Sequence, residues 1–128
     1  MARPTVPATS LVNHLFGGSA YVQPSAWWIA VYSADPGLGI TGTSPASLNT
    51  NRKQITGWTR AANVATNTAQ IVFDPVPVGQ TWNVTHYAIF DAQTAGDPIC
   101  YGAFDVSKTI SSGDVFTIGA SRISISES

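Results

Sequence analysis

The chain has 128 residues and a formal net charge of −1, and 10% of its residues are charged, against about 25% in a typical soluble domain. This length corresponds to one domain that can bury a core without disulfides or a metal. The nearly neutral charge argues against nucleic-acid binding, and a 44% hydrophobic content argues against disorder. The sequence contains no apolar run of about 18 residues, so no membrane span is predicted. The N-terminus shows no apolar secretory signal.

Ser and Thr supply much of the polarity, with thirteen Ser and fourteen Thr. A hydroxyl-rich, uncharged surface repels its neighbours weakly, which suits a protein that stays in contact with other subunits. Thr is also favoured in strands, so the same composition is typical of an ordinary β-rich fold. Both interpretations stay open at this point.

Residues 1–9 contain two prolines and no hydrophobic periodicity, which predicts an extended arm in front of a single domain over residues 10–128. Pro4 and Pro7 cannot occupy a central strand position. Nothing in the arm can build a core, so we expect it to dock on an adjacent subunit or on the shell beneath, and to contribute little to the fold.

A short helix is predicted directly after the arm. Ser10 is a suitable N-cap, Leu11 and Leu15 are spaced i and i+4, and Gly17-Gly18 can end the helix after about two turns. A helix this short is marginal in isolation. We therefore expect Leu11, Leu15 and Phe16 to pack against the body of the domain or a neighbouring subunit.

The rest of the chain reads as short strands separated by turn residues. Residues 37–55 predict a long loop with a short edge segment, and residues 91–98 predict a hairpin loop. No helical pattern separates the strands, which argues against a parallel α/β fold. Seven or eight short strands with turns about every ten residues are typical of a sandwich or barrel. The predicted fold is an all-β, antiparallel, jelly-roll-like β-sandwich with one short N-terminal helix. The predicted strands are residues 26–32, 57–62, 67–73, 82–90, 99–104, 108–110, 114–118 and 122–126.

The candidate catalytic groups form no recognisable motif. His14 lies on the short helix, whereas His86 lies within a strand, where we expect it to be partly buried and to bond a backbone carbonyl. Asp91 and Asp105 could orient a histidine, but the sequence lacks the Gly-x-Ser-x-Gly elbow. Cys100 has apolar neighbours, which favours a core position over a reactive thiolate. The sequence therefore predicts no enzymatic activity.

No metal or cofactor site is predicted either. Asp91 and Asp97 flank a loop that could hold calcium, yet turn formation explains them better, as it does Asp35 before Pro-Gly. A phosphate-binding loop needs glycines that lie between a strand and the start of a helix. The glycines at 17–18 and 37–39 do not lie in such a position, so they are interpreted as caps and turns.

The four tryptophans could form a stacking platform for sugars. Trp27 and Trp28 are adjacent in a strand, so at most one of them belongs to any one surface. Trp58 and Trp82 lie near strand starts, where they are expected to close the ends of the core. A core or subunit-interface position is the simpler interpretation for all four.

Several segments occur together in a characteristic order: a short helix followed by glycine and an aromatic, an apolar strand ending in Asp-Pro, a Gly-aromatic-x-Arg segment, a Val-Thr-His strand ending in Asp-Ala, and two closing strands with a turn. In this order they resemble a family of small virion proteins of tailed bacteriophages, usually labelled tail-fibre-like. The resemblance spans about residues 10–126. The segments are residues 11–21, 28–37, 57–60, 84–92, 101–104 and 108–114.

The resemblance implies a non-enzymatic structural subunit docked on the capsid or tail, in a decoration, cement or tail-fibre-like role. It implies other virion proteins as partners, a homo-oligomer or many copies per particle, and a location in the virion, with the host cytoplasm during assembly. It implies no cofactor, nucleic acid or membrane. It supplies no catalytic, metal or binding residues. The alternative is a glycan- or receptor-binding module at the particle surface, which would need an exposed aromatic cluster.

Overall fold

The structure, a computed structural model, describes residues 11–18, 23–37 and 47–126. Within them lie a short helix at 11–15 and nine strands, and every strand pairing is antiparallel. This confirms the all-β antiparallel fold with a short N-terminal helix. The arm predicted for residues 1–9 lies outside the described residues. The strands are β1 (Trp27–Tyr32), β2 (Lys53–Ile55), β3 (Trp58–Ala61), β4 (Val64–Asn67), β5 (Ile71–Val72), β6 (Trp82–Phe90), β7 (Pro98–Ile110), β8 (Thr117–Ile118) and β9 (Ser124–Ser126).

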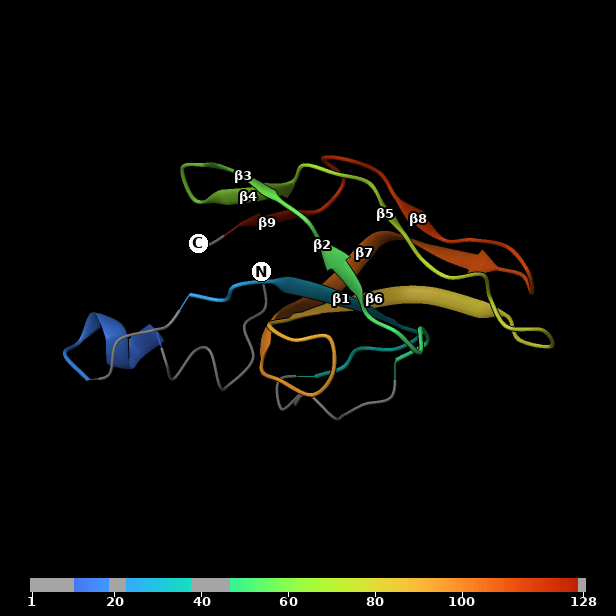
Figure 1. Cartoon of the computed structure of the whole chain (residues 1–128), viewed down its shortest axis with the longest axis horizontal. Coiled ribbons are helices and arrows are strands. Elements are labelled where there is room, and N and C mark those ends of the chain that lie inside the picture. Colours follow the sequence, from blue (N-terminus) through green and yellow to red (C-terminus); the bar gives the residue numbers. More distant parts are fainter. Residues whose placement is uncertain (1–10, 19–22, 38–46, 127–128) are drawn as a thin grey trace.

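The strands form two layers (Figure 1). One layer is a four-stranded sheet in the order β2-β1-β6-β7. The other layer is divided into a three-stranded sheet, β3-β4-β9, and a two-stranded sheet, β5-β8. The main hydrophobic core lies between the layers. One face of the large sheet is therefore covered at its two ends by two different small sheets.

Strand β1 is buried on both faces, as its continuous apolar sequence predicted. Ile29 and Val31 belong to the main core, whereas Ala30 and Tyr32 pack in a second cluster with Phe90. Because successive side chains of a strand point to opposite faces, β1 serves both clusters at once. The predicted edge segment in the long loop is also present: β2 pairs with β1 at the edge of the large sheet.

The single strand predicted over residues 67–73 is wrong. Strand β4 ends at Asn67, and β5 starts only at Ile71. The buried Asn67 side chain accepts a hydrogen bond from the Ile123 N–H (2.9 Å) and donates to the Ala69 (2.9 Å) and Gly119 (3.1 Å) carbonyl oxygens. These bonds hold a turn between the strands, so the chain crosses there from one small sheet to the other.

The two strands predicted at 99–104 and 108–110 are one strand, β7, which runs 13 residues. Its partner β6 has nine residues, and two register shifts, between Val84 and His86 and between Ile89 and Phe90, absorb the difference in length. The predicted strands at 114–118 and 122–126 are shorter than expected, since pairing is confined to Thr117–Ile118 and Ser124–Ser126.

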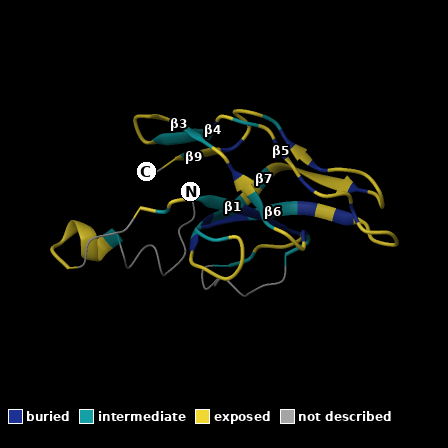
Figure 2. Cartoon of the chain, in the orientation of Figure 1, coloured by how far each residue is buried: buried dark blue, intermediate teal, exposed yellow. Residues whose placement is uncertain are grey.

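The helix forms as predicted, but Leu15 and Phe16 do not pack on the body of the domain, which was one of the two partners expected for them. The Phe16 N–H donates to the Val12 carbonyl oxygen (3.0 Å), and Gly17 ends the helix with a φ of +87°, which favours glycine. Leu15 is 63% exposed and Phe16 is 83% exposed. The helix lies beyond the start of β1, clear of both layers (Figures 1 and 2), so no strand of its own body covers it. Packing on a neighbouring subunit stays a prediction.

Candidate binding hollow

A partly open hollow of about 200 Å³ lies between the layers at the end covered by β3, β4 and β9. Most of its lining side chains are apolar, and two of them are polar. We call it the hollow and define it by its lining residues. These are Gln23, Trp27, Trp58, Arg60, Ala65, Ile89, Ile99, Cys100 and Ile125.

Strands from both layers position the lining. Trp27 on β1 meets Trp58 on β3 edge to face, with ring centroids 6.3 Å apart and an interplanar angle of 83°. Ile89 and Cys100, each 1% exposed, contribute from β6 and β7. Arg60 lies two residues after Trp58, and a spacing of two places both side chains on one face of β3. That spacing was the sequence signal for this site, and our sequence analysis did not use it.

The chemistry of the hollow suits an apolar or amphipathic guest. Its lining is mostly aliphatic and aromatic, and its polar side chains are those of Gln23 and Arg60. Trp28, the neighbour of Trp27, points to the opposite face of the sheet, as predicted. Trp82 is 3% exposed in the core. The four tryptophans therefore form no common platform.

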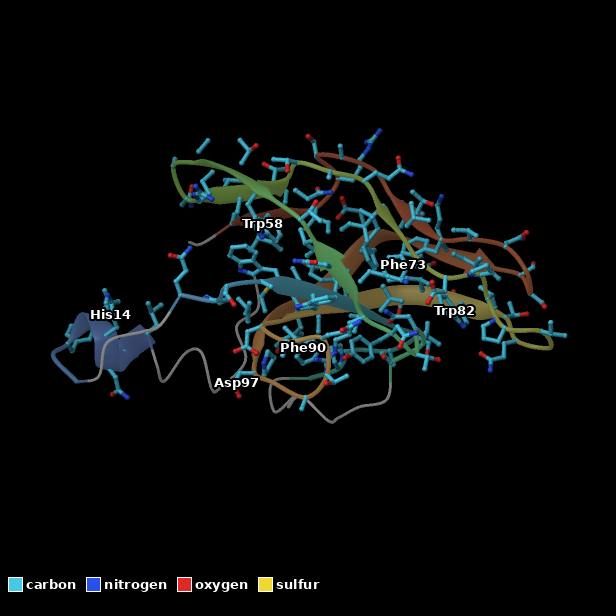
Figure 3. All side chains as sticks on the ribbon, in the orientation of Figure 1. His14, Trp58, Phe73, Trp82, Phe90 and Asp97 are labelled. Carbon is cyan, nitrogen blue, oxygen red and sulfur yellow. The ribbon has the colours of Figure 1, made fainter. Side chains whose placement is uncertain are left out.

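Aromatic rings fill the other end of the same interior. Phe73 lies 5.2 Å from Phe116, Phe116 lies 6.1 Å from Phe104, and Phe104 lies 5.2 Å from Tyr87, measured between ring centroids. We call these four residues the filled end. Figure 3 labels Phe73 there and Trp58 at the hollow. Burial in this ring series raises the pKa of Tyr87 to about 12, and Coulombic interactions with Cys100 and Asp105 add to the shift.

A second, more polar groove of about 490 Å³ lies on the surface beside the filled end. Lys108, Arg122 and Asp105 lie along it together with the exposed Val106. Phe104 and Phe116 of the filled end also line this groove, so charges of both signs share its surface with apolar side chains.

The two histidines lie in separate parts of the molecule. His14 is on the exposed helix (Figure 3). His86 Nδ1 lies 2.8 Å from the Thr85 hydroxyl oxygen, so its partner is a side chain and not the predicted backbone carbonyl. The Thr85 hydroxyl also reaches the Tyr32 carbonyl oxygen at 3.4 Å. Cys100 is a buried core residue, as predicted.

The predicted turn roles of the aspartates are confirmed. Asp91 Oδ1 accepts the Asp97 N–H at 2.8 Å, and Asp35 Oδ1 accepts the Gly37 N–H at 2.9 Å. Both carboxylates thus stabilise loop backbone. Across residues 11–18, 23–37 and 47–126, no three His, Cys, Asp or Glu side chains gather as metal ligands.

Arg52 links the hairpin loop to Phe90 of the second cluster, a role that the sequence did not predict. Its guanidinium carbon lies 3.6 Å from the centroid of the Phe90 ring, and its Nη1 donates to the Ala92 (2.9 Å) and Ala95 (2.7 Å) carbonyl oxygens. Burial lowers the pKa of Arg52, while Tyr32 and Asp91 oppose that shift. No local pattern could reveal contacts some 40 residues apart in the chain.

The described residues thus form an all-β fold of antiparallel sheets with an apolar hollow between its two layers. The chain belongs to the family described as Podophage GP4 fiber I protein gp80, which matches residues 4–126. This membership confirms the tail-fibre-like resemblance and supports a structural role in a phage particle. No curated protein matches the chain. Within the described part of the chain, no helix has both the length and the apolar character required to cross a bilayer.

Proposed function

We propose that the chain is a non-enzymatic structural subunit of the phage virion that docks on other virion proteins at the tail. The observation that carries this proposal is the family match over residues 4–126, nearly the whole chain. The fibre description of that family favours the tail over capsid decoration.

The described surface is consistent with docking. The helix leaves Leu15 and Phe16 exposed, and such apolar side chains on a marginal helix gain stability only from a partner surface. The low charge of the chain keeps repulsion between neighbouring subunits small. The groups with catalytic potential have structural tasks: Asp91 holds a loop and Cys100 lies in the core.

The position in the particle can be tested by electron microscopy of virions that carry an epitope tag after Ser128, decorated with a gold-labelled antibody. We expect label at the tail. Label distributed over the capsid faces would replace the tail position with capsid decoration. Virions without label, from cells that make the tagged protein, would contradict a virion subunit altogether.

The N-terminal arm is proposed as an assembly element. A variant lacking residues 1–9 should keep its thermal midpoint within about 4 °C, since a small loss of contacts shifts the midpoint little in a domain of this size. Its incorporation into particles should fall clearly. Unfolding of the truncated chain, or unchanged incorporation, would contradict this role.

The absence of enzymatic activity is tested by turnover assays on esters, glycosides and peptides. We expect no turnover above the buffer. Turnover that survives purification and disappears in His86→Ala would overturn the proposal, and His14→Ala serves as the matched control on the separate helix.

Glycan binding is the second candidate function, because the hollow combines two tryptophans with Arg60 and Gln23. A sugar ring would stack on an indole, and the polar side chains would bond its hydroxyls. Binding of the purified protein to a glycan array, lost in Trp58→Ala and retained in Trp28→Ala on the other face, would favour this function over docking. No glycan bound at millimolar concentration would remove it.

A further inference from the structure

We propose that the hollow receives the N-terminal helix of a second copy of this chain, so that copies join head to tail. The proposal deepens the structural role above and rests on it, since it names one partner of the subunit. Two observations carry it: an apolar helix face without a cover, and an apolar hollow without a filling, both on the same chain.

The helix is amphipathic. At about 100° per residue, Leu11, Val12, Leu15 and Phe16 fall within a stripe about 140° wide, whereas Asn13 points to the opposite side. Val12, Leu15 and Phe16 are 55%, 63% and 83% exposed. Residues 11–18 contain no Lys, Arg, Asp or Glu. The stripe therefore offers a neutral, apolar surface that requires no charged partner.

The hollow matches this surface in size and chemistry. An apolar cavity of about 150 Å³ holds one benzene ring, so about 200 Å³ accommodates the Phe16 ring and part of a second aliphatic side chain. The edge-to-face Trp27 and Trp58 pair presents ring surfaces to an incoming aromatic.

A second copy is favoured as the source of the helix because the chain's own helix lies clear of both layers (Figure 1). Each copy carries both the helix and the hollow. Every copy can therefore insert its helix into one neighbour and receive the helix of another. This contact joins two different surfaces, and such an interface closes into a ring when the rotation between copies allows it.

The test measures self-association of the purified full chain by sedimentation over a range of concentrations. Phe16→Asp should weaken self-association at least about tenfold, which corresponds to about 1.4 kcal/mol. Asn13→Asp adds the same charge on the opposite side of the helix and should leave self-association unchanged. Ala65→Phe fills the hollow from within and should weaken self-association to a similar extent.

A mixing experiment then separates exchange between copies from docking within one chain. Phe16→Asp retains an intact hollow and Ala65→Phe retains an intact helix, so the mixture should form a one-to-one dimer that neither variant forms alone. A monomeric wild type at every concentration, equal association of wild type and Phe16→Asp, or a mixture without heterodimers would overturn the proposal. Because particles are not involved, these results stand apart from the labelling experiment on virions.

Discussion

The same face of the four-stranded sheet is covered in two different ways at the two ends of the interior. At the filled end, Phe73, Phe104, Phe116 and Tyr87 form a continuous series of rings beneath β5 and β8. At the hollow, β3, β4 and β9 face the same sheet across a space of about 200 Å³. Apolar side chains line both ends, but the rings of the filled end contact one another in series, whereas the side chains at the hollow leave a space between the layers.

This difference assigns the stability of the fold to one end and access for a binding partner to the other. Rings in close contact stabilise the fold, and the space beside Phe104 and Phe116 is the more polar surface groove. An incompletely filled end forgoes some of that stabilisation and keeps an apolar site open to a partner. The filled end should therefore dominate the free energy of unfolding, and the hollow should dominate association.

The largest expected effect is at the filled end. Phe73 is 2% exposed, so Phe73→Ala should lower the free energy of unfolding by about 3–5 kcal/mol, through lost burial and the cavity left behind. Urea unfolding followed by fluorescence measures it. The control is Val72→Ala, next to it on β5 and 51% exposed, which should stay within about 0.5 kcal/mol. Equal effects of the two substitutions would contradict the assignment of this end as the core.

The second-largest loss of stability is expected at the turn held by Asn67, between the two small sheets. Asn67 is 1% exposed and bonds backbone groups beside both small sheets. Asn67→Ala should cost about 1–3 kcal/mol, because it leaves the buried Ile123 N–H without its partner. The exposed Asn83 on β6 offers a control, with an expected effect below about 0.5 kcal/mol. A cost below 1 kcal/mol for Asn67→Ala would show that the turn holds without this side chain.

Enlarging a side chain should have opposite signs at the two ends. Val76 is 2% exposed in the packed core, so Val76→Phe should destabilise by about 1–3 kcal/mol through overpacking. Ala65 lines the hollow, so Ala65→Leu should stabilise by up to about 1 kcal/mol, since its added methyl groups enter apolar space. The same urea unfolding measures both. Destabilisation of equal size at both positions would mean that the hollow has no spare volume.

Burial of Tyr87 in the ring series should also make stability depend on pH in the alkaline range. The pKa of Tyr87 is raised from 10.0 to about 12 by burial, so the folded state holds the phenol proton more tightly than the unfolded state. This contribution is complete below pH 10 and is lost as the pH rises from about 10 to about 12. Tyr87→Phe should lose less stability than the wild type across that window. Parallel loss in both proteins, with one tyrosine fewer titrating near pH 10 in Tyr87→Phe than in the wild type, would contradict burial of the phenol.

The smallest effect is expected on the helix. Leu15 is 63% exposed, so Leu15→Ala should change the stability of the dilute, monomeric chain by less than about 0.5 kcal/mol. The contrast is Ile89→Ala in the hollow floor, 1% exposed, with an expected cost of about 2–5 kcal/mol. A cost above 2 kcal/mol for Leu15→Ala in the monomer would mean that the helix packs on its own chain.

By itself, the sequence determined the elements whose cause is local. The apolar run of β1 predicted a strand buried on both faces, Gly17-Gly18 predicted the helix end, and Asp91 predicted a turn carboxylate. These follow from backbone preference and side-chain periodicity, which act over a few residues.

Tertiary structure alone decided the rest. The division of 67–73 into two strands depends on Asn67 meeting Ile123 and Gly119, and the Arg52 contact joins segments some 40 residues apart. The hollow exists because Trp27 and Trp58 meet across two layers without filling the space between them. The sequence pattern shows that a residue faces the interior, but the volume left there depends on how two sheets from distant parts of the chain pack together.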